Sequence, residues 1–243
     1  MDDMTRFAVY YAPRPGPFAD ATAAWLGWDL ARGQPVDQPT PALPRPLSDI
    51  TRAPRRYGFH GTIKPPFRLA KGLRPEALVQ ATAELAARLA QVTLPGLHLP
   101  NLHLPNLHLP GPDLPQADRF LALTPTGDTA PLQALAATVV QVLDPFRAEL
   151  TEAEILRRRP DRLTARQRDL LATFGYPHVM EEFRFHLTLT GTLNEAEHPA
   201  IAAAAAAQVA GLLPEPFRIA DLCLCGEDAD GRFHLLHRFA LST

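Results

Sequence analysis

Apolar side chains recur along the chain at spacings that alternate between those of strands and those of helices. β-Branched and aromatic residues fill positions 6–12 before Pro13 and Pro15, which indicates a strand that ends at the prolines. Positions 183–190 alternate strictly between apolar and polar residues, the period of a half-buried strand. Positions 75–91 instead repeat leucine at helical spacing behind an N-terminal proline, so a helix is predicted there.

The same reasoning over the whole chain predicts a mixed α/β (α+β) fold. The expected strands are 6–12, 57–69, 119–123, 183–190, 217–225 and 232–241, and the expected helices are 18–30, 75–91, 131–146, 164–174 and 195–213. The last two strands flank a turn between Gly226 and Gly231 and should form a hairpin. Because no expected strand is far from a helix, we expect sheets that helices cover on one face.

Two proline-rich segments interrupt this pattern, and the 26 prolines among 243 residues are about twice the average of about 5%. Six of them lie between Gln34 and Arg56 and remove too many backbone donors for regular structure, which predicts a long loop. A second segment, about 95–115, repeats the pentads GLHLP, NLHLP and NLHLP and places His98, His103 and His108 five residues apart. Since five is the period of neither a strand face nor a helix face, an extended insertion is favoured over a shared metal site.

Composition narrows the class of protein. With 46% apolar residues, the chain can form one domain over 1–243 around a hydrophobic core. Its 24 Lys and Arg nearly balance 26 Asp and Glu, so no global basic field attracts nucleic acid, and a nucleic-acid partner is not favoured.

The sequence also predicts where the protein resides. The first residues lack the basic and apolar regions of a secretory signal. The longest stretch of low polarity, 200–213, is shorter than the roughly twenty residues of a membrane-spanning helix. We therefore expect a cytoplasmic protein that does not cross a membrane, with Cys223 and Cys225 as small buried hydrophobes.

One short pattern occurs twice, in separate halves of the chain. Residues 59–63 read FHGTI and residues 185–189 read FHLTL, so each copy has an aromatic residue, a histidine and, two positions later, a threonine. Nine histidines in a chain with 20 Ser and Thr residues should give about 0.7 His-x-Ser/Thr matches by chance. Two are present, both inside strand patterns and with matched flanking residues. The presence of two matched copies, more than either copy alone, indicates a functional site.

The pattern places the same two side chains together in each copy. On a strand, residues i and i+2 project from one face, so His60 points with Thr62 and His186 points with Thr188. If the two strands face one another, two imidazoles and two hydroxyls converge on one small volume. An imidazole titrates near pH 6.5, so one can take a proton from water while the other gives one to a departing oxygen. The hydroxyls can bind phosphoryl oxygens, and such a site would hydrolyse a phosphodiester without a metal or cofactor.

These two copies resemble the paired His-x-Thr/Ser motifs of the two-histidine phosphoesterase superfamily. The segments RFAVYYAP, RRYGFHGTIKPPFRLA, DPFRAEL, FGYPHV and FRFHLTLTG resemble the branch of that superfamily found with phosphonate-utilisation genes. The resemblance implies a bilobal fold, in which two pseudo-symmetric lobes of mainly antiparallel sheet, with helices outside, face a central cleft. It also implies that His60 and His186 are catalytic and that Thr62 and Thr188 bind phosphate. The pentad insertion is not part of the family pattern.

Five further residues are candidates for contact with the substrate. Lys64 and Arg184 each lie two residues from a motif residue, so alternation should place them on its face, where they could meet phosphate charge. Tyr11, Tyr57 and Tyr176 could line the cleft and stack on a base or ribose.

The leading hypothesis is a metal-independent phosphodiesterase that hydrolyses a small cyclic phosphodiester, with a phosphorylated sugar or nucleotide as its partner. The resemblance points to a ribose cyclic phosphate from phosphonate breakdown. Three alternatives are a phosphodiesterase that acts on 2′,3′-cyclic RNA ends, a non-catalytic module that binds a phosphorylated ligand, and a metal hydrolase that uses the pentad histidines. The run Arg157 to Arg159 is interpreted as a solvated helix end rather than as a polyanion site.

Overall fold

The structure, a computed structural model, describes residues 1, 3–99 and 120–243. Within these residues, seven strands form one sheet in which each neighbouring pair is antiparallel. In sheet order they are β11 (Phe233–Ala240), β10 (Asp221–Glu227), β1 (Arg6–Tyr11), β4 (Gly61–Phe67), β8 (Leu187–Thr188), β7 (Ala122–Pro125) and β6 (Leu97–His98). The strands that follow the two His-x-Thr histidines, β4 and β8, are therefore neighbours at the centre of the sheet.

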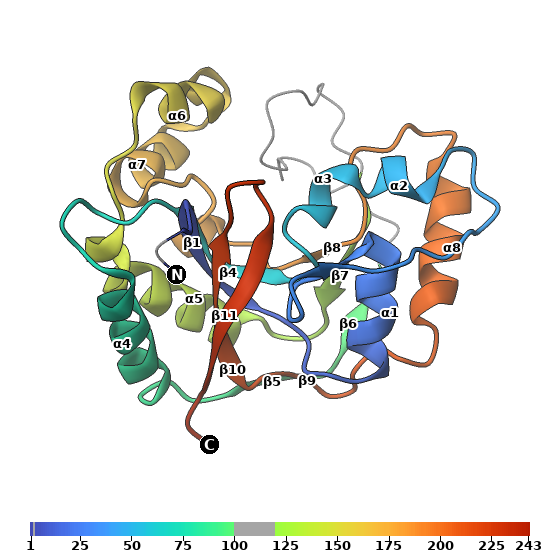
Figure 1. Cartoon of the computed structure of the whole chain (residues 1–243), viewed down its shortest axis with the longest axis horizontal. Coiled ribbons are helices and arrows are strands. Elements are labelled where there is room, and N and C mark those ends of the chain that lie inside the picture. The colour runs from blue at the N-terminus through green and yellow to red at the C-terminus, as the bar shows by residue number, and fades with distance from the viewer. Residues whose placement is uncertain (2, 100–119) are drawn as a thin grey trace.

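Besides the short helix α2 (Leu47–Ile50), four helices contribute to the main hydrophobic core. They are α1 (Pro17–Leu26), α4 (Pro75–Ala86), α5 (Ala130–Val142) and α8 (His198–Val209). In Figure 1, α4 and α5 lie to the left of the β10–β11 hairpin and α1 and α8 lie to its right. Helices thus flank the central strands on both sides of this view.

The two faces of the sheet are buried differently. Along β1, Phe7, Val9 and Tyr11 enter the main core with the helices. The alternate residues Ala8 and Tyr10 enter a second, smaller cluster on the other face, which also holds Ala12, Leu30, Cys223, Cys225 and Phe233. Both cysteines are free and buried, as expected of small hydrophobes. The second face is covered by fewer apolar side chains, so it is the face on which polar groups can gather.

Shorter elements complete the described chain. They are β2 (Trp28–Asp29), β3 (Gln34–Pro35), α2 (Leu47–Ile50), α3 (Arg52–Arg55), β5 (Val92–Leu94), α6 (Glu152–Arg157), α7 (Ala165–Phe174), β9 (Phe217–Ile219) and the 3-10 helices η1 (Asp144–Phe146), η2 (Pro160–Arg162) and η3 (Met180–Glu182). None of the helices in the described ranges is both long and apolar enough to cross a membrane.

The predicted mixed α/β class, the antiparallel sheet and the C-terminal hairpin are confirmed. The loop expected from Gln34 to Arg56 is wrong in part, since it contains α2 and α3 as well as β3. The single strand expected over 217–225 is divided, because β9 pairs with β5 whereas β10 pairs with β1 and β11. Only Leu187–Thr188 of the strand expected over 183–190 joins the sheet.

The helix expected to reach Leu30 stops at Leu26. Gly27 adopts a left-handed conformation, with φ of 79°, and its amide donates to the Ala23 carbonyl. A Cβ at this position would lie 2.9 Å from the Gln38 side chain. Glycine therefore ends the helix and lets the chain turn into β2, where apolar periodicity alone predicts that the helix continues.

Trp25 ties α1 to the segment that follows β8. Its side chain is 1% exposed, and its Nε1 donates to the Leu189 carbonyl at 2.9 Å. Trp25→Phe keeps an aromatic ring but leaves that buried carbonyl without its donor, so we expect a loss of about 1–3 kcal/mol in the free energy of unfolding, measured with urea. Leu73→Ala, at a residue that is 40% exposed, should change it by less than about 0.5 kcal/mol. Equal losses in the two variants would contradict this role of Trp25.

Candidate functional site

The pairing of β4 with β8 brings the two His-x-Thr patterns together. Gly61 lies directly across from Leu187 in an antiparallel pair. One step further in each direction, this register places His60 across from Thr188 and Thr62 across from His186. Facing Cβ atoms in such a pair are about 4.5–5.5 Å apart. The four polar side chains therefore form a crossed group, which we call the His-Thr quartet.

The quartet projects from the face opposite the main core. Thr62 pairs with Tyr10, which belongs to the second cluster, and the His60 ring stacks on the Tyr10 ring with 3.9 Å between centroids. Leu187, which points the other way, is fully buried in the main core. The expectation that both motifs present their histidine and threonine on one face is thus consistent with the register.

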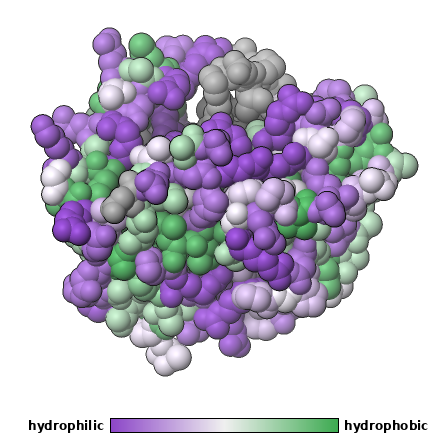
Figure 2. All heavy atoms as spheres, in the orientation of Figure 1, coloured by the Kyte–Doolittle hydropathy of each residue, from purple (hydrophilic) through white to green (hydrophobic). Residues whose placement is uncertain are grey.

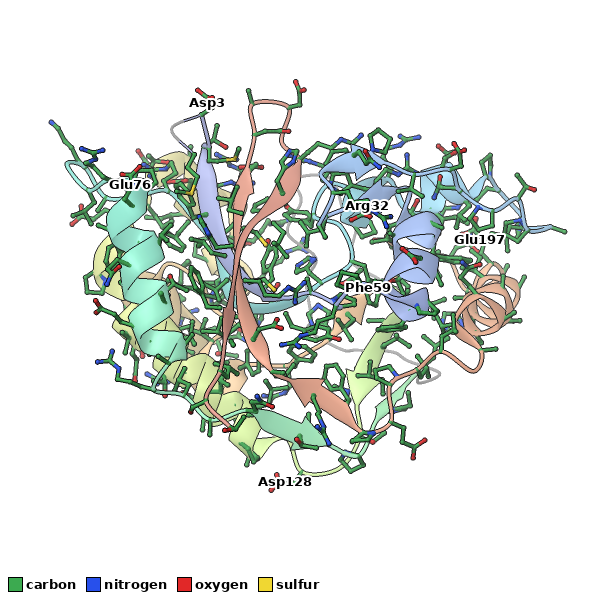
Figure 3. The ribbon with its side chains drawn as sticks, turned by 60° about the horizontal axis from the view of Figure 1, so that its bottom comes forward. Asp3, Arg32, Phe59, Glu76, Asp128 and Glu197 are labelled. Carbon is green, nitrogen blue, oxygen red and sulfur yellow. The ribbon has the colours of Figure 1, made fainter. Side chains whose placement is uncertain are left out.

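Aromatic residues next to the histidines anchor both copies in the core. Phe59 and Phe185 are 4% and 7% exposed. The Phe59 ring packs edge-on against Phe18 of α1, and Figure 3 shows Phe59 beside that helix. Phe185 fills the space beside Gly61, where a Cβ would lie 2.2 Å from its ring. Glycine at position 61 therefore allows the two copies to approach each other.

The same backbone contact orients each imidazole. Nδ1 of His60 lies 2.9 Å from the Gly58 carbonyl, and Nδ1 of His186 lies 2.8 Å from the Arg184 carbonyl. A carbonyl oxygen only accepts, so Nδ1 carries the proton in both rings. Nε2 is then the nitrogen that exchanges protons, and in His60 it lies 3.1 Å from the Thr62 hydroxyl, which donates to it.

Burial holds both imidazoles in the neutral form. It lowers the pKa of His60 to about 4, although the hydrogen bond to Gly58 opposes the shift, and the charge of His186 lowers this pKa further. Burial also lowers the pKa of His186, against the opposing bond to the Arg184 carbonyl. Both rings are therefore neutral near pH 7 in the free protein, with lone pairs on Nε2.

Two of the expected substrate contacts do not lie on the face of the quartet. Tyr11 is 8% exposed and packs edge-on against Phe217, so it belongs to the main core and does not line a cleft. Lys64 does not share a face with Thr62, because Ile63 is an extra residue in the pairing of β4 with β1. The Lys64 ammonium is buried, donates to the Val140 carbonyl and lies 3.5 Å from Asp144.

The other expected contacts are exposed or half-buried. Arg184 is exposed, and its guanidinium donates to the carbonyls of Glu181 and Phe183. Arg184 contacts the quartet through its backbone carbonyl, which accepts a hydrogen bond from His186 and so orients that ring. Tyr57 is half-buried, and its ring centroid is 6.0 Å from that of His60. Tyr57 is therefore the expected tyrosine that lies beside the quartet.

Tyr57 also lines a cavity of about 760 Å³, whose lining residues do not include the quartet. Tyr176 lines it as well, with the Arg158 guanidinium 4.7 Å from the centre of its ring. Arg157 to Arg159 lie at the end of α6, as expected, and all three residues also line this cavity. Sequence patterns did not single out the other lining arginines, because they come from segments far apart in the chain.

The described part of the chain contains no group of side chains that could together bind a metal ion. Among residues 1, 3–99 and 120–243, no three His, Cys, Asp or Glu side chains are grouped so that they could hold a metal ion. Of the pentad histidines, His98 is exposed and its Nδ1 bonds to the Thr124 carbonyl at 3.1 Å. His103 and His108 lie outside the described residues, so the hypothesis of a pentad metal site is not tested.

The sequence matches a protein family over residues 62–234, described as "Protein of unknown function (DUF1045)". Two curated relatives share the name ribose 1,5-bisphosphate phosphokinase PhnN. The protein of Janthinobacterium sp. (strain Marseille) is 38% identical over 199 residues, which are 81% of this chain and 41% of that protein. The protein of Laribacter hongkongensis (strain HLHK9) is 35% identical in an alignment of length 224 that covers 87% of this chain and 46% of that protein. The chain thus spans less than half the length of these relatives.

A solved structure described as a crystal structure of a phosphoesterase aligns with 98% of this chain and 99% of its own, at 15% identity and a TM-score of 0.42. This likeness is too low to support an argument about the fold or the activity.

Gly61→Ala tests whether close approach of the two copies builds the quartet. The added Cβ would overlap the Phe185 ring, so the strands must separate or the ring must move. We expect a loss of about 1–3 kcal/mol in the free energy of unfolding by urea. Gly96→Ala is the matched control. The nearest heavy atom to its added Cβ would lie 3.8 Å away, so the free energy of unfolding should change little. If Gly61→Ala were as stable as the wild type, the close approach of Phe185 to position 61 would not be required for the two strands to pair.

The lowered pKa of His60 predicts how stability depends on pH. Between about pH 6.5 and about pH 4, the unfolded chain binds a proton on this residue and the folded chain does not, so stability falls as the pH falls. His60→Gln should therefore lose less thermal stability than the wild type between pH 7 and pH 5. His237→Gln, which removes a histidine of β11 outside the quartet, is the control. If the thermal stability of His60→Gln fell between pH 7 and pH 5 as much as that of the wild type, the lowered pKa of His60 would be contradicted.

Proposed function

The chain belongs to the DUF1045 family, and from that premise we propose that it hydrolyses a small cyclic phosphodiester by general acid and base catalysis with His60 and His186. The observation that carries the proposal is the His-Thr quartet. Two imidazoles lie at the starts of adjacent strands, each oriented by a carbonyl two residues earlier, and the Thr62 hydroxyl donates to Nε2 of His60. This is the arrangement that the resemblance to two-histidine phosphoesterases implies.

In the proposed reaction, water attacks the phosphorus atom of the cyclic ester. One imidazole accepts a proton from the water at Nε2, and the other donates a proton from Nε2 to the ring oxygen that leaves. The new bond is P–O from water, the broken bond is P–O to the sugar, and the product is a phosphate monoester. Thr62 and Thr188 donate hydrogen bonds to the non-bridging oxygens as their negative charge grows.

The burial of the histidines suits this division of roles. A base must be neutral at working pH, and burial lowers the pKa of both rings. The acid must instead hold a proton, and a bound phosphodiester supplies a negative charge that raises the pKa of the imidazole beside it. Substrate binding thus protonates one ring while the other stays a base.

The named relatives support a phosphorylated ribose as the class of substrate, with phosphonate catabolism as the context that the resemblance suggests. We do not propose a phosphokinase reaction of the P-loop kind for this chain. Such kinases cradle phosphates with a loop that ends in Gly-Lys-Ser/Thr, and this sequence has no such triplet.

Turnover of a ribose cyclic phosphate by the purified protein tests the proposal. We expect His60→Ala and His186→Ala each to lower kcat by about two to four orders of magnitude, because each removes a proton-transfer group. His237→Ala should retain turnover, and so should the wild type in EDTA.

Three results would overturn the mechanism. Full turnover by both histidine variants would remove the histidines from the chemistry. Loss of activity in EDTA would indicate a metal. Tight binding of the cyclic phosphate without any turnover would instead favour a non-catalytic binding module.

A further inference from the structure

The cavity beside Tyr57 concentrates positive charge in a chain whose formal net charge is only −2. Nine Lys and Arg side chains line it, against the two glutamates Glu154 and Glu227. Figure 2 shows mainly hydrophilic side chains over α6 and α7, the elements that form one wall. Its volume of about 760 Å³ is in the range of pockets that enclose small ligands.

Part of this charge is already neutralised by neighbouring carboxylates. Arg6 makes two hydrogen bonds to Glu227, both at 2.5 Å. Arg68 makes two to Glu154, at 3.0 and 2.8 Å. Lys64 and Arg147 share Asp144. These carboxylates offset most of the positive charge of Arg6, Arg68, Lys64 and Arg147, and Lys64 and Arg147 share a single one.

On the wall formed by α6 and η2, by contrast, the arginines are largely not neutralised by neighbouring carboxylates in the part of the chain that the structure describes. Among the described residues, Arg158 and Arg162 have no carboxylate within ion-pair distance, and Arg159 reaches Asp161 only at 3.9 Å. Arg158 rests over the Tyr176 ring, which holds its guanidinium at the cavity. Arg159 keeps a left-handed backbone, with φ of 50°, which is unfavourable for a residue with a side chain. Free guanidinium groups thus gather on one side of the cavity.

We propose that Arg158 and Arg162 bind a second, non-reacting phosphate of the substrate, a monoester on the same small sugar whose cyclic phosphodiester is held by the quartet. Guanidinium groups bind phosphate oxygens through paired, charge-assisted hydrogen bonds. The inference rests on the proposed function, because it names the substrate class of that same site.

Tyr57 connects the two anion sites. It lines the cavity, and its ring centroid is 6.0 Å from that of His60. Its ring also stacks on Phe233, with 5.2 Å between the ring centroids. A sugar can lie against this ring with one phosphate toward the histidines and the other toward α6.

The first experiment compares two substrates, a ribose cyclic phosphate with and without a phosphate monoester on its primary hydroxyl. We expect the wild type to favour the phosphorylated compound by at least about tenfold in kcat/KM, mainly through KM. The double variant Arg158→Gln/Arg162→Gln should lower this ratio toward one. Arg74→Gln, an exposed arginine outside the cavity, should keep the ratio. An unchanged ratio in a folded double variant would overturn the proposal.

The second experiment separates this proposal from the catalytic one. Binding of ribose 5-phosphate, measured by calorimetry, should weaken at least about tenfold in Arg158→Gln/Arg162→Gln and remain in His60→Ala/His186→Ala. Binding without any turnover by the wild type would reject the proposed hydrolysis while retaining the anion site. Wild-type affinity in the arginine variant would reject the anion site. A preference for RNA with a cyclic end that grows with each added nucleotide would show that the cavity holds a polynucleotide backbone instead.

Discussion

The close contact between β4 and β8 is the constraint on which the rest of the site depends. Gly61 faces Leu187 across the sheet, and the Phe185 ring occupies the space that a side chain at position 61 would need. Leu187 and Phe185 bury apolar area in the main core, which pulls the two strands together. Antiparallel pairing then decides which polar groups meet on the opposite face. A hydrophobic interaction on one side of the sheet thus assembles a polar group on the other.

Burial that stabilises the sheet also sets the chemical state of the quartet. The His60 ring lies on the buried Tyr10 ring, and this environment disfavours its charged form. Each imidazole donates from Nδ1 to a backbone carbonyl, so its rotation and its tautomer are both determined by the chain. In the reaction that we propose, the anionic substrate restores to one imidazole the charge that burial removes.

Charge is distributed unevenly for a nearly neutral chain. Acidic partners neutralise the cations next to the sheet, whereas Arg158 and Arg162 on the α6–η2 wall have none within the described residues. Balanced net charge argues against a broad polyanion surface, and it is compatible with a local site for one small anion. The roles that we propose for the neutral histidines and the free arginines are complementary, proton transfer in one place and fixed positive charge in another.

Local periodicity in the sequence was enough to predict the five longest helices, the longer strands of the sheet, and the placement of His60 with Thr62 and of His186 with Thr188 on one face, because these depend on neighbours within a few residues. It did not predict the bounds of the short elements α2, α3, α6, β2, β3, β5 and β6. It was misleading for Lys64, since an extra residue in the pairing with β1 reverses its face, and for Tyr11, whose burial depends on Phe185 and Phe217 far along the chain. Only the tertiary structure decided which strands are neighbours and which arginines gather at the cavity. The pairing of β4 with β8 joins residues more than a hundred positions apart, and the cavity arginines come from separate segments, so no local pattern records either.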